Sequence, residues 1–195
     1  MKKTEKILAI VAVLSVLLNL STVPFSAVLT TISFTGLSLL YMYLSFALFN
    51  NISFRQILKK ESYQEVSRIR IFATVLTGMA LSVCLIGILF KLLLYPFAEI
   101  NLITGLNGLS IAIIVSAIMY VIRKDKFYVS ILKRIMIVGA VGILFTLTSR
   151  EQIIDIKYRN HPEHKEALKK AWADPENQEL WKKAEEESLK MHNEK

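Results

Sequence analysis

The sequence predicts an all-α, polytopic membrane protein with five transmembrane helices, a duplicated helical hairpin and a short helical C-terminal tail. Three observations predict this fold. Of the 195 residues, 53% are hydrophobic, which is more than a soluble domain usually carries. Five apolar stretches approach the roughly 20 residues that a helix needs to cross a bilayer. Two short motifs also recur at one common offset of 72 residues, each between two apolar stretches.

The five apolar stretches cover residues 7–23, 25–49, 69–94, 97–122 and 127–149. The fifth is the weakest, because Lys133 and Arg134 interrupt it, and the uncharged remainder would reach only about 22 Å at 1.5 Å per residue. It can span if the helix begins near Phe127 and both basic side chains extend back to the interface. If it lies at the interface instead, the tail returns to the cytoplasm.

The recurring motifs are a Pro-Phe corner, at Pro24 and Pro96, and a Gly-Leu-Ser triplet that begins at Gly36 and Gly108. Proline lacks the N–H that would continue a helix, so each corner predicts a tight turn that exposes little backbone to hydrocarbon. The matches predict parallel repeats, although a chance match of short apolar patches is the alternative. We therefore divide the chain into hairpin 1 (1–49), a basic loop (50–68), hairpin 2 (69–122), a fifth helix (123–149) and a soluble tail (150–195).

The net charge of +8 lies in three segments that a five-span topology places on one side. The N-terminus carries +2, the segment 55–70 carries +3 and the segment 123–134 carries +4, while the tail from residue 150 carries −1. Cytoplasmic segments of membrane proteins are enriched in Lys and Arg, which predicts a cytoplasmic N-terminus and an external, periplasmic tail in the inner membrane. Topology therefore explains the charge, and we expect no nucleic-acid binding.

The start of the chain also resembles a secretory signal, since charged residues precede an apolar run. No clear small-x-small cleavage site precedes Pro24, and residues 7–20 correspond to 79–92 in the second repeat. We therefore expect the first span to be retained.

The candidate functional or packing residues lie around the second corner. Lys91 either pairs with Glu99 across the corner or extends to the outer interface, and its counterpart in the first repeat is Asn19. Asn101 begins a polar stripe with Thr104, Gly105 and Gly108, which suits either a solute pathway or helix packing. The two corner prolines, Pro24 and Pro96, complete the candidates.

Small residues recur every four positions at Gly108, Ala112 and Ser116, which allows close helix approach. This face predicts either packing within the monomer or a homo-oligomer interface. The single cysteine, Cys84, is expected to be a packing residue within the third span.

The tail predicts two short helices, Pro162–Ala173 and 175–191, with Asp174 as the N-cap of the second. Trp172 and Trp181 can pack together, rest on the membrane interface or dock a partner protein. We expect no metal site, since His161, Glu163 and His164 have no further ligands nearby.

The segment 87–106, with Phe90-Lys91 followed by Tyr95-Pro96-Phe97, resembles the gliding-motility L proteins of Bacteroidota, which form the inner-membrane ring of the type IX secretion motor. The tail looks more like small uncharacterised Bacteroidota membrane proteins with the same corner. Of the functional positions in that family, only Lys91 carries over. The membrane glutamate of the family falls at about Leu109, so the resemblance implies a shared corner rather than ion coupling.

We expect a non-enzymatic membrane protein, because the chain has no nucleotide loop, nucleophile elbow or metalloprotease motif. The leading hypothesis is a structural or assembly role in the envelope, related to gliding or secretion machinery, with the tail meeting a protein partner. The alternative is a small solute or ion transporter or channel. No cofactor is expected; the lipid bilayer is the expected environment.

Overall fold

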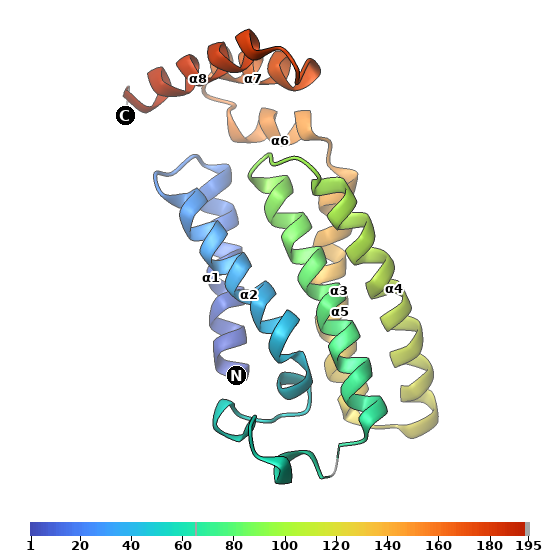
Figure 1. The fold of residues 1–195 in the computed structure, drawn as a ribbon. Helices are drawn as coiled ribbons and strands as arrows, with labels where there is room; N and C mark the ends of the chain where they lie inside the picture. Colours follow the sequence, from blue (N-terminus) through green and yellow to red (C-terminus); the bar gives the residue numbers. More distant parts are fainter. Residues whose placement is uncertain (65, 194–195) are drawn as a thin grey trace.

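The computed structural model describes residues 1–64 and 66–193, and over these residues the chain is helical without strands. Residue 65 of the predicted loop and residues 194–195 of the predicted tail lie outside the described residues. Five long helices run side by side (Figure 1): α1 (Lys2–Leu20), α2 (Ser26–Phe49), α3 (Arg68–Leu92), α4 (Ala98–Arg123) and α5 (Lys126–Leu147). Three shorter helices lie across one end of them: α6 (Arg150–Lys157), α7 (Pro162–Ala173) and α8 (Gln178–Asn193). The all-α prediction is confirmed.

Four helices, α2 to α5, are long and apolar enough to cross a membrane, which is the character of a membrane protein. This finding differs from the expectation that the fifth apolar stretch is the weakest candidate span. The fifth predicted span qualifies as α5, whereas α1 is not among the four, since Lys2, Lys3, Glu5 and Lys6 lie in its first turns.

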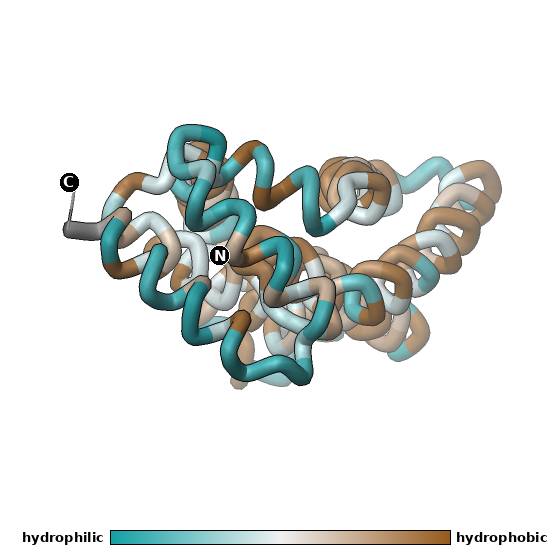
Figure 2. The backbone as a smooth tube through the Cα atoms, turned by 90° about the horizontal axis from the view of Figure 1, so that it is seen from above, coloured by the Kyte–Doolittle hydropathy of each residue, from teal (hydrophilic) through white to brown (hydrophobic). Residues whose placement is uncertain are grey.

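The two ends of the bundle differ in character. The N-terminus, the two 3-10 turns Phe54–Gln56 and Lys60–Tyr63, and the turn between α4 and α5 lie at one end, which we call the loop end (Figure 1). Both Pro-Phe corners and the tail lie at the other, the corner end. The three basic segments thus share the loop end. Figure 2 shows hydrophobic residues along the long helices and largely hydrophilic residues along the tail.

The two corners have the same backbone geometry. In each, the first helix ends in a Schellman motif, with the Val23 N–H donating to the Leu18 carbonyl at 3.1 Å and the Tyr95 N–H to the Phe90 carbonyl at 2.8 Å. Left-handed φ angles of 52° to 62° occur at matching positions, 72 residues apart: Thr22 and Phe25 in one corner, Leu94 and Phe97 in the other. Pro24 and Pro96 follow the motif directly, where a helix cannot continue. The sequence repeat is therefore also a repeat of local structure.

Helix α3 is the centre of the bundle and packs against α2, α4 and α5. Ser38 of α2 and Ser82 of α3 lie within hydrogen-bond distance, at 2.6 Å between hydroxyl oxygens, and join the two hairpins. Glycines set the contact of α3 with α4 near the corner. A Cβ atom on Gly87 would lie 2.7 Å from the Leu102 nitrogen, and one on Gly105 would lie 2.5 Å from the Cys84 nitrogen. The two backbones therefore touch at this end.

Gly105→Ala is expected to destabilise the protein by about 1–3 kcal/mol, because the new methyl group meets Cys84 backbone that can move only if α4 shifts. Gly36→Ala is the matched control. Its Cβ would meet only the flexible Leu8 side chain, at 3.4 Å, and alanine favours the helix. Equilibrium unfolding in mixed micelles measures both variants, and equal stability of the two would contradict the close α3–α4 contact.

The tail differs from the prediction in two places. The second tail helix begins at Gln178 rather than at 175, because the Asn177 side chain accepts hydrogen bonds from the N–H groups of Glu179 and Leu180. Asp174 is therefore not its N-cap. Helix α6 was not expected, and it follows α5 directly behind a capping box formed by Ser149 and Gln152.

Candidate functional site

The second corner holds an ion pair between Lys91 and Glu99, which is one of the two interpretations of Lys91 that the sequence allows. The Lys91 ammonium donates to a Glu99 carboxylate oxygen at 2.7 Å. The Lys91 side chain is only 4% exposed, whereas that of Glu99 is 47% exposed. The lysine is thus buried beneath the corner, and the glutamate closes over it from the first turn of α4.

Glu99 also connects the corner to the tail. Its second carboxylate oxygen lies 3.8 Å from an Arg150 nitrogen, and the Arg150 guanidinium stacks 3.8 Å above the Trp172 ring. The rings of Trp172 and Trp181 meet edge to face at 5.1 Å, as the mutual-packing interpretation predicted. Lys91, Glu99, Arg150 and Trp172 therefore form a continuous set of contacts from α3 to α7, which we call the corner–tail cluster.

An apolar cluster supports the same junction. Leu94 of the corner and Ile153 and Ile154 of α6 are buried together. Partly buried side chains pack around them, from Phe145 of α5 to Tyr158, Leu168 and Trp172 of the tail. Burying such side chains contributes about 1.5–3 kcal/mol each, so the tail is held on the corner end by more than charge.

Asn101 is not part of this cluster, because its amide donates to the Phe97 carbonyl at 3.0 Å within its own helix. Two other residues of the predicted polar stripe, Thr104 and Gly105, also lie outside this cluster. Thr104 is exposed on the outer face of α4, and Gly105 contacts Cys84. Asn101, Thr104 and Gly105 therefore do not line a common space. Cys84 is buried, as expected of a packing residue.

The first corner carries a polar counterpart. Asn19, which matches Lys91 in the repeat, is buried, and within the described residues its Oδ1 atom has no hydrogen-bond partner. Each hairpin thus places one polar side chain beneath its corner. Only the second has an acid to pair with it, since position 27 is alanine where position 99 is glutamate.

A second polar cluster, which the sequence did not predict, lies near the loop end. Arg134 of α5 donates from Nε and Nη2 to the two carboxylate oxygens of Glu5 in α1, at 2.5 and 2.7 Å. The Tyr41 hydroxyl of α2 donates to the same carboxylate at 2.8 Å, and the Phe49 ring lies 5.2 Å from the guanidinium. This Glu5–Arg134–Tyr41 cluster joins three helices that are distant in sequence.

Arg134 therefore turns inward to Glu5 of α1, while Lys133 next to it is exposed. The physical reason is that bidentate pairing with a carboxylate compensates the loss of hydration of a buried guanidinium. The signal was present in the sequence. Topology places Glu5 and Arg134 at the same end of the bundle, one as an acid within a basic segment and the other as a base within an apolar stretch.

His164, one of the two histidines weighed as metal ligands, makes its contacts within the tail. His164 is buried, with its ring 4.5 Å from that of Tyr158 and its Nδ1 atom 3.2 Å from the Ala184 carbonyl oxygen. Within residues 1–64 and 66–193, no group of three or more His, Cys, Asp or Glu side chains could hold a metal ion.

Lys157→Met is expected to strengthen tail docking at neutral pH by up to about 3 kcal/mol, since one pKa unit corresponds to about 1.4 kcal/mol. Burial in α6 lowers the pKa of Lys157 to about 8 from 10.5. Above pH 8 the docked lysine loses its proton while the undocked one keeps it up to pH 10.5, so docking grows more favourable as pH rises between these values. Protease cleavage of the tail should slow over this range in the unmodified protein and depend less on pH in the variant. An identical pH dependence in both would contradict the burial of Lys157.

No protein-family model, curated protein sequence or solved structure shows a significant match to this chain.

Proposed function

We propose that this chain is a non-enzymatic envelope protein with a structural or assembly role, in which the membrane helices hold the tail as a platform for a protein partner. One observation carries this proposal: the tail is fastened to the corner end by the corner–tail cluster and by the apolar cluster around Ile154. A freely moving tail would need neither. A docked tail has a fixed outer surface, and a fixed surface lowers the entropic cost of binding a partner.

The same proposal includes five spans and a duplicated hairpin. The matching Schellman motifs and left-handed residues support an internal repeat of α1–α2 and α3–α4. The basic segments at the loop end support a cytoplasmic N-terminus and an external tail. Helix α1 would cross with its first turns at the interface, where Lys2, Lys3 and Lys6 meet lipid headgroups.

A link to the type IX secretion motor is also part of the proposal. It is supported by the position of Lys91, the one motor-family position that carries over, which is buried and paired beneath the corner. Leu109, at the place of the motor glutamate, is buried among apolar side chains. The proposed role is therefore in assembly next to such machinery rather than in coupling ion flow.

Photo-crosslinking tests the assembly role. A photoreactive amino acid at Leu189, which is 60% exposed on α8, should give a discrete crosslinked product in cells that mass spectrometry identifies. Leu58, another exposed leucine but at the loop end, is the matched control and should not give this product. Arg150→Gln, which removes the contact of the tail with Glu99, should reduce the product at Leu189.

The assembly proposal fails if several exposed tail positions give neither a partner nor self-association. The alternative, a small transporter or channel, is favoured by the Glu5–Arg134–Tyr41 cluster, because charged groups buried among membrane helices commonly serve ion or solute movement. Flux assays in liposomes distinguish it: a transporter should show flux that Tyr41→Phe alters, whereas an assembly protein should show none.

A further inference from the structure

A cavity of about 620 Å³ lies between α3, α4 and α5 in the half of the bundle near the loop end. Its walls are largely apolar and include Phe72 and Leu76 of α3, Ile111, Ala112 and Val115 of α4, and Ile131 of α5. Phe72, Leu76, Ile111 and Val115 are themselves exposed on the bundle surface, so the cavity opens sideways toward the bilayer. Its volume lies within the range of ordinary ligand pockets.

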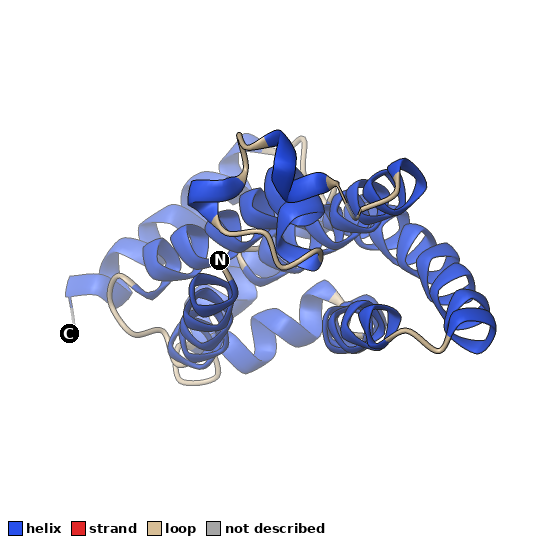
Figure 3. Ribbon diagram, turned by 90° about the horizontal axis from the view of Figure 1, so that it is seen from below, coloured by secondary structure: helices blue, strands red, loops and turns tan. Residues whose placement is uncertain are grey.

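The cavity exists because α3 and α4 diverge. Close contacts at Gly87, Gly105 and Gly108 join the two helices from the corner to about the middle of α4. Beyond Gly108, α4 tilts away from α3 and α5 toward the loop end, as seen from below in Figure 3. Ala112 and Ser116 then face the opening, and their side chains are too short to fill it. Of the three small residues predicted to bring helices together, Gly108 thus does so, whereas Ala112 and Ser116 leave space.

The end of the cavity next to the loops is basic. Arg70 and Arg123 both line it, and Lys124 and Lys126 follow in the turn between α4 and α5. Arg70 is engaged, since it pairs with Asp125 at 3.3 Å and stacks 3.5 Å from the Phe127 ring. Arg123 is exposed and makes no ion pair with any residue that the structure describes. An anion at this point would meet the Arg123 guanidinium, with two further basic residues nearby in the sequence.

We propose that this cavity binds an anionic phospholipid from the leaflet at the loop end, with one acyl chain between α3 and α4 and the phosphate beside Arg123. Basic pockets between membrane helices bind anionic headgroups by this chemistry. A transmembrane helix from a second copy fits less well. Helices α2, α3 and α5 carry no acidic residue, so none of them would supply an anion beside Arg123.

Native mass spectrometry of the purified chain tests this site with two lipids that share acyl chains, phosphatidylglycerol and phosphatidylcholine. Phosphatidylglycerol should bind more tightly, at one site. Arg123→Gln should weaken its binding by about fivefold and leave phosphatidylcholine unchanged, because one basic side chain near an anionic surface contributes on that scale. Ser116→Phe, which fills the cavity, should weaken binding of both lipids.

Two matched controls accompany these variants. Arg55→Gln removes an exposed arginine of the loop end that does not line the cavity, and Ile103→Phe adds bulk on the exposed face of α4 near the corner. Both should bind phosphatidylglycerol as the unmodified chain does. The proposal is overturned if the two lipids bind equally, or if Arg123→Gln has no more effect than Arg55→Gln. It is also overturned if Ala112→Cys crosslinks two copies in lipid, since a second copy would then occupy the cavity. Arg123 is exposed, so its variant remains a valid test even if Ser116→Phe fails to fold.

Discussion

Arg134→Met is expected to lower the free energy of unfolding by about 3–5 kcal/mol, the largest effect of any single substitution considered for this chain. Both oxygens of the Glu5 carboxylate accept from Arg134, so the variant leaves that carboxylate buried between α1 and α2 with only Tyr41 beside it. A buried charge without its partner is strongly destabilising. Equilibrium unfolding in mixed micelles at neutral pH measures the loss.

The double variant Glu5→Gln/Arg134→Met supplies the control. Replacing a whole buried ion pair by uncharged groups is often nearly neutral, so the double variant should recover most of the lost stability. The coupling energy from the double-mutant cycle then reports the pair itself. A loss of less than about 1 kcal/mol of unfolding free energy in Arg134→Met, the value for an exposed ion pair, would show that Glu5 and Arg134 do not form a buried ion pair.

Glu99→Gln should cost at least about 2 kcal/mol more stability than Lys91→Met, although each removes the same ion pair. The asymmetry follows from burial. Without Glu99, the 4% exposed Lys91 ammonium has lost its partner beneath the corner, whereas without Lys91 the 47% exposed Glu99 remains hydrated and beside Arg150. Unfolding of the two variants, side by side in the same micelles, gives the difference.

Glu99→Gln has a second expected effect, because the tail also loses the contact of Arg150. Protease cleavage in the α5–α6 connection should become faster in Glu99→Gln than in Lys91→Met. Glu151→Gln, which changes a neighbouring exposed acid on α6, should behave like the unmodified chain in both assays. Equal costs for Glu99→Gln and Lys91→Met would show that Lys91 reaches the interface and is not buried.

Most of the helical framework follows from the sequence for simple physical reasons. Hydrocarbon requires that backbone groups be paired within each segment, so long apolar stretches separated by a proline corner or by a charged segment define helices with little ambiguity. The offset of 72 residues predicted that the corners match, and the left-handed residues at Phe25 and Phe97 do match. Charge patterning likewise predicted which segments share an end.

What the sequence did not predict depends on contacts between distant segments. The Glu5–Arg134 pair joins residues 129 positions apart, and hydropathy treats each charge separately rather than as a pair. Helix α6 was missed because Ser149 ended the predicted span, although the same residue caps the next helix. The cavity was missed because small residues predict close approach only if the helices stay parallel, and the tilt of α4 is a property of the whole bundle.

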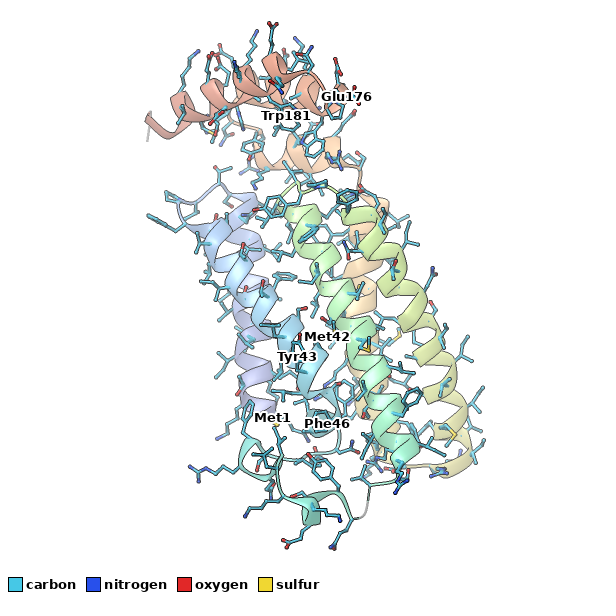
Figure 4. The ribbon with its side chains drawn as sticks, in the orientation of Figure 1. Met1, Met42, Tyr43, Phe46, Glu176 and Trp181 are labelled. Atoms are coloured by element: carbon cyan, nitrogen blue, oxygen red, sulfur yellow. The ribbon has the colours of Figure 1, made fainter. Side chains whose placement is uncertain are left out.

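Cysteine accessibility at three positions tests the central claim, five spans with the tail opposite the loops, most directly. The sites are Lys3 at the N-terminus, Lys60 in the loop, and Glu176, an exposed residue in the turn between α7 and α8 that Figure 4 labels. Cys84 is buried and should contribute little background.

A membrane-impermeant thiol reagent added to intact cells should label Glu176→Cys, while Lys3→Cys and Lys60→Cys should react only after the membrane is opened. Labelling of Lys3→Cys together with Glu176→Cys in intact cells would show that α1 does not cross. Labelling of all three only in opened cells would place the tail on the same side as the loops and contradict the topology.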